Sequence, residues 1–404
     1  MFIHGDVAFM IVSTVLVLFM TPGLALFYGG LVERKNSLTM MYQSFISIGV
    51  VTVLWILGGF SLVFGKDIGG VIGNPLDFFA LANVTFTPNL DYSDTIPFIL
   101  FFMYQLMFAI ITAPLMTGAY ANRLTIGGWI RVLIVWMIFI YFPVAHWIWG
   151  GGFLSKMGFL DYAGGTVIHI TSGFGCLGGL YYLGPRAYKN EEGPFHLGII
   201  AIGAAILLFG WFGFNAGGSL AAAETAAIVF ANTGIAAASG MVTWCILFYI
   251  EKKSFSFLEM IIGMVAGLAT VTPAAGYVGP LGAFIIGIIA GVICFFCVLF
   301  EHKWKRLDDA LDVWGVHGMG GFIGSLCIGL LSNPVVNGVY IGMRQFLIQL
   351  FGSVLVAIYS IVMTYLIFLV CDKTIPITVS KEVQKSGLDN EFFGESFSDF
   401  KNKF

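Results

Sequence analysis

Long apolar stretches dominate the chain and are separated by short polar connections. A helix needs about 20 mostly apolar residues to cross the hydrocarbon core of a bilayer. Runs of this kind predict eleven membrane-spanning helices, over residues 6–30, 39–64, 95–120, 126–149, 162–183, 195–218, 225–250, 257–277, 280–300, 311–331 and 343–371. The pattern therefore predicts an all-α integral membrane protein, with a transmembrane domain over residues 1–371 and a polar cytoplasmic tail over residues 372–404.

The composition agrees with this pattern. Of the 404 residues 58% are hydrophobic and only 10% are charged, whereas a soluble domain carries about 25% charged residues. The 52 glycines suit helices that pack closely in lipid. The net charge of −3 leaves no broad basic field for nucleic acid. We therefore expect a bilayer as the surroundings and no nucleic-acid partner.

Lysine and arginine predict the orientation because they accumulate on the cytoplasmic side. Sixteen of the 19 lie after odd-numbered spans, at the start of span four or in the tail. Only Lys66, Lys156 and Arg344 lie on the other side. The amino terminus is therefore predicted outside and the carboxyl terminus inside.

Two histidines support a division of the chain into halves. Five spans precede the polar connection at 184–194, five follow it, and a final helix remains. An odd-numbered half must return inverted, which predicts a 5+5 inverted repeat with a site near the midplane. His169 and His317 lie in the last span of each half, after Asp161 and Asp312 respectively.

The two histidines are the strongest chemical candidates because ionisable groups inside a span are costly and usually functional. Each could simply hydrogen-bond a neighbouring helix. Alternatively, the two rings touch in a pore, where neutral imidazole both donates and accepts hydrogen bonds. Such a pair can pass a proton or line a path for a small polar molecule.

Aromatic and acidic residues are further candidates, and for Trp149 and Asp161 two interpretations stay open. Trp149 is either an interfacial anchor or an indole face for a cation arriving from outside. Phe108 and Phe214 carry no spacing that marks them as a gate. Asp161 and Asp312 are expected to cap the starts of spans five and ten, with direct cation binding as the alternative for Asp161. No metal or other cofactor is predicted, since Cys294 and Cys297 lack further ligands nearby.

Several motifs in order resemble the ammonium transporter (Amt/Mep/Rh) family, of the bacterial Amt type, over essentially the whole chain. They are Phe27-Tyr-Gly-Gly-Leu31, Asp161-Tyr-Ala-Gly-Gly-Thr-Val-Ile-His169 continuing to Gly184-Pro-Arg186, Gly210-Trp-Phe-Gly-Phe-Asn-Ala-Gly217, Thr272-Pro-Ala-Ala-Gly-Tyr277 and Asp312-Val-Trp-Gly-Val-His-Gly318.

The resemblance implies a transporter rather than an enzyme. It implies a homotrimer in the cytoplasmic membrane with one pore in each subunit, and ammonium, with methylammonium as an analogue, as the substrate. Ammonia, alone or with a proton, would pass through an apolar pore. The implied residues are Trp149, Phe108 and Tyr104 at an outer ammonium site, Phe108 and Phe214 as a gate, His169 and His317 as the twin pore histidines, and Asp161 as a buried structural carboxylate.

The chain departs from the family pattern at two places. The family commonly has serine at the fourth position of Asn-x-Gly-Ser, but this chain reads Asn215-Ala-Gly-Gly218 with Ser219 one residue later. Either Ser219 reaches the outer site through a local bulge, or the hydroxyl is missing. In the tail, Phe393 replaces the usual histidine. The resemblance implies docking of a PII-type signalling protein at the cytoplasmic face; an unregulated tail is the alternative.

Two other classes of function stay open. One is an ammonium sensor with little flux that signals through its tail. The other is an intramembrane redox enzyme that uses His169 and His317 as haem ligands, although the sequence lacks the further histidine ligands and cofactor motifs of such enzymes.

Overall fold

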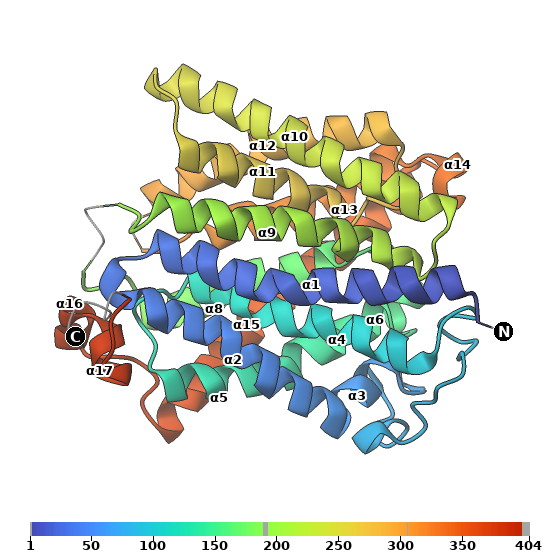
Figure 1. Cartoon of the computed structure of the whole chain (residues 1–404), viewed down its shortest axis with the longest axis horizontal. Helices are drawn as coiled ribbons and strands as arrows, with labels where there is room; N and C mark the ends of the chain where they lie inside the picture. Colours follow the sequence, from blue (N-terminus) through green and yellow to red (C-terminus); the bar gives the residue numbers. More distant parts are fainter. Residues whose placement is uncertain (1, 189–192, 305, 398–404) are drawn as a thin grey trace.

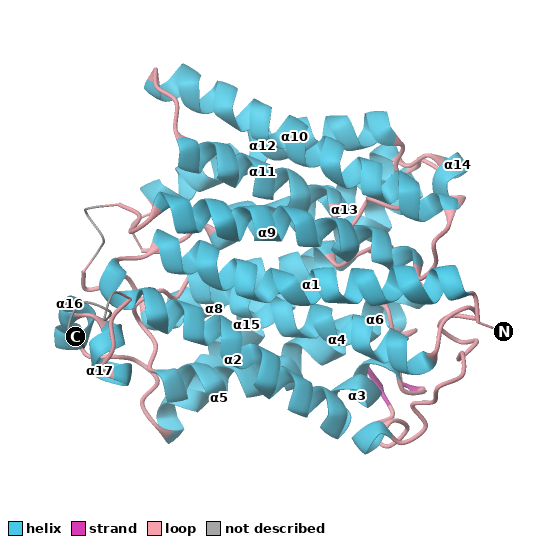
Figure 2. Ribbon diagram, in the orientation of Figure 1, coloured by secondary structure: helices cyan, strands magenta, loops and turns pink. Residues whose placement is uncertain are grey.

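The protein is a bundle of long helices that lie side by side, seen in a computed structural model (Figures 1 and 2). The structure describes residues 2–188, 193–304 and 306–397. Short 3₁₀ and π turns, labelled η, extend or interrupt several helices. In chain order the elements are α1 (His4–Leu31), η1 (Arg34–Asn36), α2 (Ser37–Leu54), η2 (Trp55–Gly59), α3 (Phe60–Phe64), β1 (Asp67–Ile68), β2 (Ile72–Gly73), η3 (Phe79–Leu81), α4 (Phe98–Leu115), η4 (Met116–Gly118), α5 (Ile126–Trp136), η5 (Met137–Tyr141), α6 (Phe142–Ile148), α7 (Phe153–Lys156), η6 (Gly165–Ile170), α8 (Thr171–Leu183), α9 (Leu197–Ala216), η7 (Gly217–Ser219), α10 (Glu224–Lys252), α11 (Phe257–Val271), α12 (Pro280–Lys303), η8 (Trp314–Gly318), α13 (Met319–Leu331), α14 (Pro334–Asn337), α15 (Met343–Thr374), α16 (Lys381–Ser386) and α17 (Leu388–Phe393).

The helices have the length and composition of a multi-pass membrane protein. Within the described residues, nine helical segments are long and apolar enough to cross a bilayer, and α11 is a shorter apolar helix. The predicted span 257–277 is too long, because α11 ends at Val271. The following Thr272-Pro273 explains this end, since proline has no N–H for the helical ladder and its ring clashes with the preceding turn.

The connections between neighbouring spans are stabilised by specific hydrogen bonds. Before α5, the Thr125 hydroxyl accepts a hydrogen bond from the Gly128 N–H at 2.9 Å, as an N-cap does. Between α11 and α12, the Asn232 side chain donates to the carbonyls of Ala275 and Val278 at 2.8 and 2.7 Å. These bonds satisfy backbone groups that the helices leave free, which apolar surroundings require.

Glycines set the spacing between α1 and α9, which pack along each other (Figure 1). A Cβ atom on Gly203 would lie 2.4 Å from the Phe27 backbone nitrogen, and one on Gly23 would lie 2.6 Å from Ile206. Such distances are too short for any side chain. The small residues therefore let two backbones approach closely, the usual device for helix packing in membranes.

The loop between α3 and α4 begins with the antiparallel pair β1–β2, in which Asp67 lies opposite Gly73. Asp67 also pairs with His146 at 2.9 Å and Lys156 at 2.5 Å. These two hydrogen bonds lower the pKa of Asp67 to about 2. The contacts fix the loop to α6 and α7, beside the segment that carries Trp149.

The tail packs against the bundle at the end opposite the amino terminus (Figure 1). The Asp389 carboxylate accepts hydrogen bonds from the N–H groups of Leu38 and Thr39 at 2.9 and 2.8 Å. Asn36 accepts the Leu388 N–H at 2.9 Å. Asp389 thus satisfies free N–H groups at the start of α2, where a negative charge is favoured.

Candidate functional site

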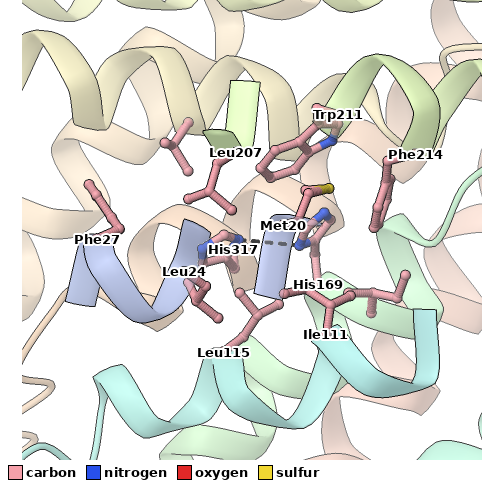
Figure 3. Close-up of a pocket in the computed structure, with 12 residues that line it drawn as sticks. Met20, Leu24, Phe27, Ile111, Leu115, His169, Leu207, Trp211, Phe214 and His317 are labelled. Atoms are coloured by element: carbon pink, nitrogen blue, oxygen red, sulfur yellow. Dashed lines mark hydrogen bonds between the residues drawn. The ribbon is translucent and has the colours of Figure 1, made fainter. Parts of the chain in front are cut away.

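Two buried histidine rings touch inside a pocket of the protein (Figure 3). The Nδ1 atoms of His169 and His317 lie 3.2 Å apart, and the rings are nearly parallel, with centroids 5.2 Å apart. Both side chains are buried. The sequence placed the two histidines in separate halves of the chain, and the structure brings them into direct contact.

Two π turns position the rings. His169 belongs to η6 and His317 to η8, each of which continues into a regular helix. The helices cross at glycines: a Cβ atom on Gly173 would lie 2.2 Å from the Gly318 nitrogen, and one on Gly321 would lie 2.3 Å from the Gly165 carbonyl oxygen. Close backbone contact therefore brings the two imidazoles together.

Asp161 caps η6 with both carboxylate oxygens. It accepts hydrogen bonds from four consecutive N–H groups, those of Gly164, Gly165, Thr166 and Val167, at 2.7 to 3.0 Å. The side chain is buried. Such a buried carboxylate holds the start of the histidine-bearing turn.

The corresponding cap of η8 is Asp309, which corrects the sequence prediction of Asp312. Asp309 accepts the Trp314 N–H at 2.9 Å and is buried. Asp312 instead bonds His302 at 2.7 Å. The reason is conformational, since Asp312 has a left-handed φ of 57° at the bend before η8 and its carboxylate meets His302.

A narrow apolar lumen surrounds the histidines (Figure 3). Its free space is about 20 Å³, room for about one water-sized molecule. The His169 Nε2 atom is buried there and has no hydrogen-bond partner among the described residues. The lining residues are Met20, Leu24, Phe27, Ile111, Leu115, Ile168, His169, Leu207, Trp211, Phe214, Val265 and His317.

A wider pocket of about 410 Å³ lies on one side of the lumen. Trp149, Phe108 and Tyr104 all line it, as do Asp161 and Tyr162. The Trp149 indole N–H donates to the Asp161 carbonyl at 2.9 Å, and its ring meets Phe108 edge-on at 5.9 Å. The predicted outer-site aromatic residues therefore gather around one cavity.

Phe108 and Phe214 lie at the boundary between the pocket and the lumen. Phe108 lines the wider pocket and Phe214 lines the lumen. Their ring centroids are 4.6 Å apart. The Tyr104 hydroxyl donates to the Phe214 carbonyl at 2.9 Å, which holds α4 against α9.

Ser219 does not reach the pocket. Its hydroxyl bonds the carbonyls of Ala216 and Ala221 within its own turn, at 2.9 and 2.6 Å. Gly218, not Ser219, lines the cavity. One of the two alternatives left by the sequence is a local bulge that brings the Ser219 hydroxyl into the outer site. The structure shows that this alternative is wrong.

A cavity of about 280 Å³ adjoins the lumen at His317. His317 lines both spaces, and the pair of His302 and Asp312 borders the wider one. Beside it, Arg186 forms a bidentate bond to Asp308 at 2.9 and 2.8 Å. Burial opposes ionisation of Asp308, but Arg186 outweighs this and holds its pKa well below the usual range.

Sequence reasoning missed Asp308, Asp309 and Tyr162. The chain has three aspartates at 308, 309 and 312 before His317, and only their spacing could have separated them. Asp161 precedes His169 by eight residues, and Asp309 precedes His317 by the same eight. That repeated spacing is the signal that would have identified Asp309.

The chain is similar to known proteins over nearly its whole length. The profile of the Ammonium Transporter Family matches residues 8–397. A putative ammonium transporter of Methanothermobacter thermautotrophicus is 42% identical over 393 residues, which are 95% of this chain and 96% of that protein. The crystal structure of Candida albicans Mep2 aligns with a TM-score of 0.87 at 33% identity, covering 94% of this chain and 87% of that chain. A sensor Amt protein structure aligns with a TM-score of 0.88 at 29% identity, covering 95% and 97%. The chain belongs to the ammonium transporter family.

Proposed function

We propose that this chain transports ammonium across a cytoplasmic membrane. One observation carries the proposal: a pair of touching buried histidines occupies a narrow apolar lumen between two wider cavities. The relatives named as ammonium transporters support the same substrate. Methylammonium, which keeps three N–H groups and the charge, is an expected analogue.

Recruitment occurs in the outer pocket. Trp149 and Phe108 offer aromatic faces there, and Tyr104 lines the same cavity. An indole face attracts a cation by about 2 kcal/mol when both are desolvated. The aromatic pocket therefore concentrates ammonium before the narrow passage.

Ammonia, not ammonium, crosses the lumen. Loss of hydration disfavours a charged species and lowers the pKa of ammonium as it leaves water. Ammonium can respond by releasing a proton near the boundary of Phe108 and Phe214, whereas potassium has no proton to release. The proton returns outward or travels along His169 and His317.

The topology belongs to the same proposal. We infer eleven spans in a 5+5 inverted repeat with a final helix, the amino terminus outside, and a domain limit at residue 371. The equal spacing of Asp161 to His169 and of Asp309 to His317 supports two related halves. Membership of the family supports assembly as a homotrimer.

The tail is proposed as the regulatory part of the chain. Helices α16 and α17 pack at the end of the bundle opposite the amino terminus, and Asp389 joins them to α2. A PII-type protein that docks on this face would contact the tail and the inner cavity together.

The test is current on a solid-supported membrane that carries proteoliposomes. Ammonium pulses are expected to give a transient whose decay rate rises with protein density, and potassium pulses are expected to give none. A dye inside the same vesicles reports alkalinisation faster than in protein-free vesicles if neutral ammonia enters alone through the protein. Absence of both signals in protein-containing vesicles would contradict transport.

A sensor with little flux is the second candidate function. The alignment with a sensor Amt protein and the glycine at position 218 favour it. A sensor would bind ammonium without either vesicle signal, so the same experiment separates the two functions.

Trp149→Leu is expected to raise the KM for ammonium about thirtyfold, because the change removes a cation–π contact of about 2 kcal/mol. Trp147→Leu is the matched control: the Trp147 indole donates to the Val71 carbonyl at 2.9 Å, and the residue lies outside the pocket lining. Concentration series of the ammonium current measure both variants. An unchanged KM for Trp149→Leu would remove this residue from the recruitment site.

A further inference from the structure

The Tyr162 ring fills the space beside Gly218 in the outer pocket. A Cβ atom on Gly218 would lie 3.0 Å from Cε1 of Tyr162, and one on Gly276 would lie 2.0 Å from Cε2. The ring is therefore held between two glycines. Its backbone is fixed as well, since the Tyr162 N–H donates to the Pro273 carbonyl at 3.1 Å.

The Tyr162 hydroxyl is a buried polar group with an unused hydrogen-bonding capacity. It has no hydrogen-bond partner among the described residues. Among the described residues that line the pocket, no other buried side-chain nitrogen or oxygen lacks a partner. Two neighbouring groups are occupied: the Trp149 indole bonds the Asp161 carbonyl, and the Tyr104 hydroxyl bonds the Phe214 carbonyl. Asp161 uses both carboxylate oxygens on backbone N–H groups.

A buried hydroxyl without a partner costs free energy unless a ligand supplies the bond. Ammonium is suited to this position because it has four N–H donors and no acceptor. A phenol oxygen offers lone pairs, and the aromatic faces of Trp149 and Phe108 provide no directed acceptor. Potassium has no N–H to donate.

We propose that the Tyr162 hydroxyl accepts a hydrogen bond from ammonium in the outer pocket, so that Tyr162 is a binding and specificity residue. It supplies there the hydroxyl that neither Gly218 nor Ser219 provides. This inference rests on the proposed function, since it assigns an ammonium contact within the same site.

The test compares Tyr162→Phe with Ser219→Ala. Each change removes one hydroxyl, the first from a residue that lines the pocket and the second from a turn outside its lining. Tyr162→Phe is expected to raise the KM for ammonium about tenfold, the loss expected for one hydrogen bond to a charged group. The maximal current is expected to stay unchanged and the Tm is expected not to fall, whereas loss of a merely structural hydroxyl would lower the Tm. Ser219→Ala is expected to leave all three unchanged.

Calorimetric titration of the purified protein with ammonium chloride separates the inference from the transport proposal. Wild-type binding that Tyr162→Phe weakens tenfold supports the Tyr162 contact even if the vesicles show no flux. Wild-type flux with an unchanged KM and unchanged binding in Tyr162→Phe would overturn the contact and leave transport intact. A KM raised by Ser219→Ala but not by Tyr162→Phe would overturn it as well.

Discussion

Replacing both His169 and His317 by alanine is expected to abolish the ammonium-specific current or to replace it with poorly selective leakage. The two imidazoles are the ionisable side chains among the residues that line the narrow lumen. Without them, a molecule of ammonia would meet apolar walls with no hydrogen-bond partner, and a proton would have no carrier. Ammonium and potassium pulses on the same vesicles measure both the loss of current and the loss of selectivity.

Leu207→Ala is the matched control for the double variant, because Leu207 lines the same lumen and the change only enlarges it. It is expected to keep an ammonium response. If the double histidine variant retains full current and its selectivity over potassium, the histidines carry no proton. If Leu207→Ala loses selectivity to the same degree, lumen width rather than imidazole chemistry controls selection.

Asp161→Ala is expected to cause the largest loss of stability of any single change considered. It would leave four buried N–H groups without their acceptor. Each such group costs about 1–3 kcal/mol, so a total loss of about 4 kcal/mol or more is expected. The measurements are the yield of folded protein in detergent and its apparent Tm.

Asp309→Ala and Asp312→Ala test the reassigned cap. Asp309 is buried and accepts a backbone N–H, so its removal is expected to lower the Tm clearly. Asp312 pairs with the largely exposed His302, and such pairs contribute about 0–1 kcal/mol. An Asp312→Ala variant that is less stable than Asp309→Ala would restore the assignment made from sequence.

Much of the arrangement follows from sequence because hydrophobic length is a strong signal for helices in a bilayer. The apolar runs locate most helices, and the deep positions of His169 and His317 identify them as candidates. The sequence offers a touching pair only as one of two interpretations, and the structure is needed to establish the contact between these rings. That contact depends on π turns and on glycine crossings such as Gly173 with Gly318.

The predictions for the cap of η8 and for the Ser219 hydroxyl were wrong because both depend on local backbone geometry. Asp309 and Asp312 are only three residues apart, and the left-handed φ of Asp312 helps to determine which carboxylate reaches η8. Ser219 ends a 3₁₀ turn that is followed by a left-handed Leu220, so its hydroxyl bonds its own turn. Tyr162 has no distinguishing spacing, and only its position beside Gly218 draws attention to it.

The direct contact between the two Nδ1 atoms makes the histidine pair asymmetric at every moment. When both rings are neutral, one hydrogen lies between these atoms, so one ring supplies it and the other accepts it. The supplying ring then has a bare Nε2, and its neighbour carries hydrogen on Nε2. A proton that arrives at one far edge and departs from the other leaves the two rings with exchanged tautomers. The pair must return to its first arrangement before it can repeat the transfer in the same direction, so this reset would limit how often charge accompanies ammonia.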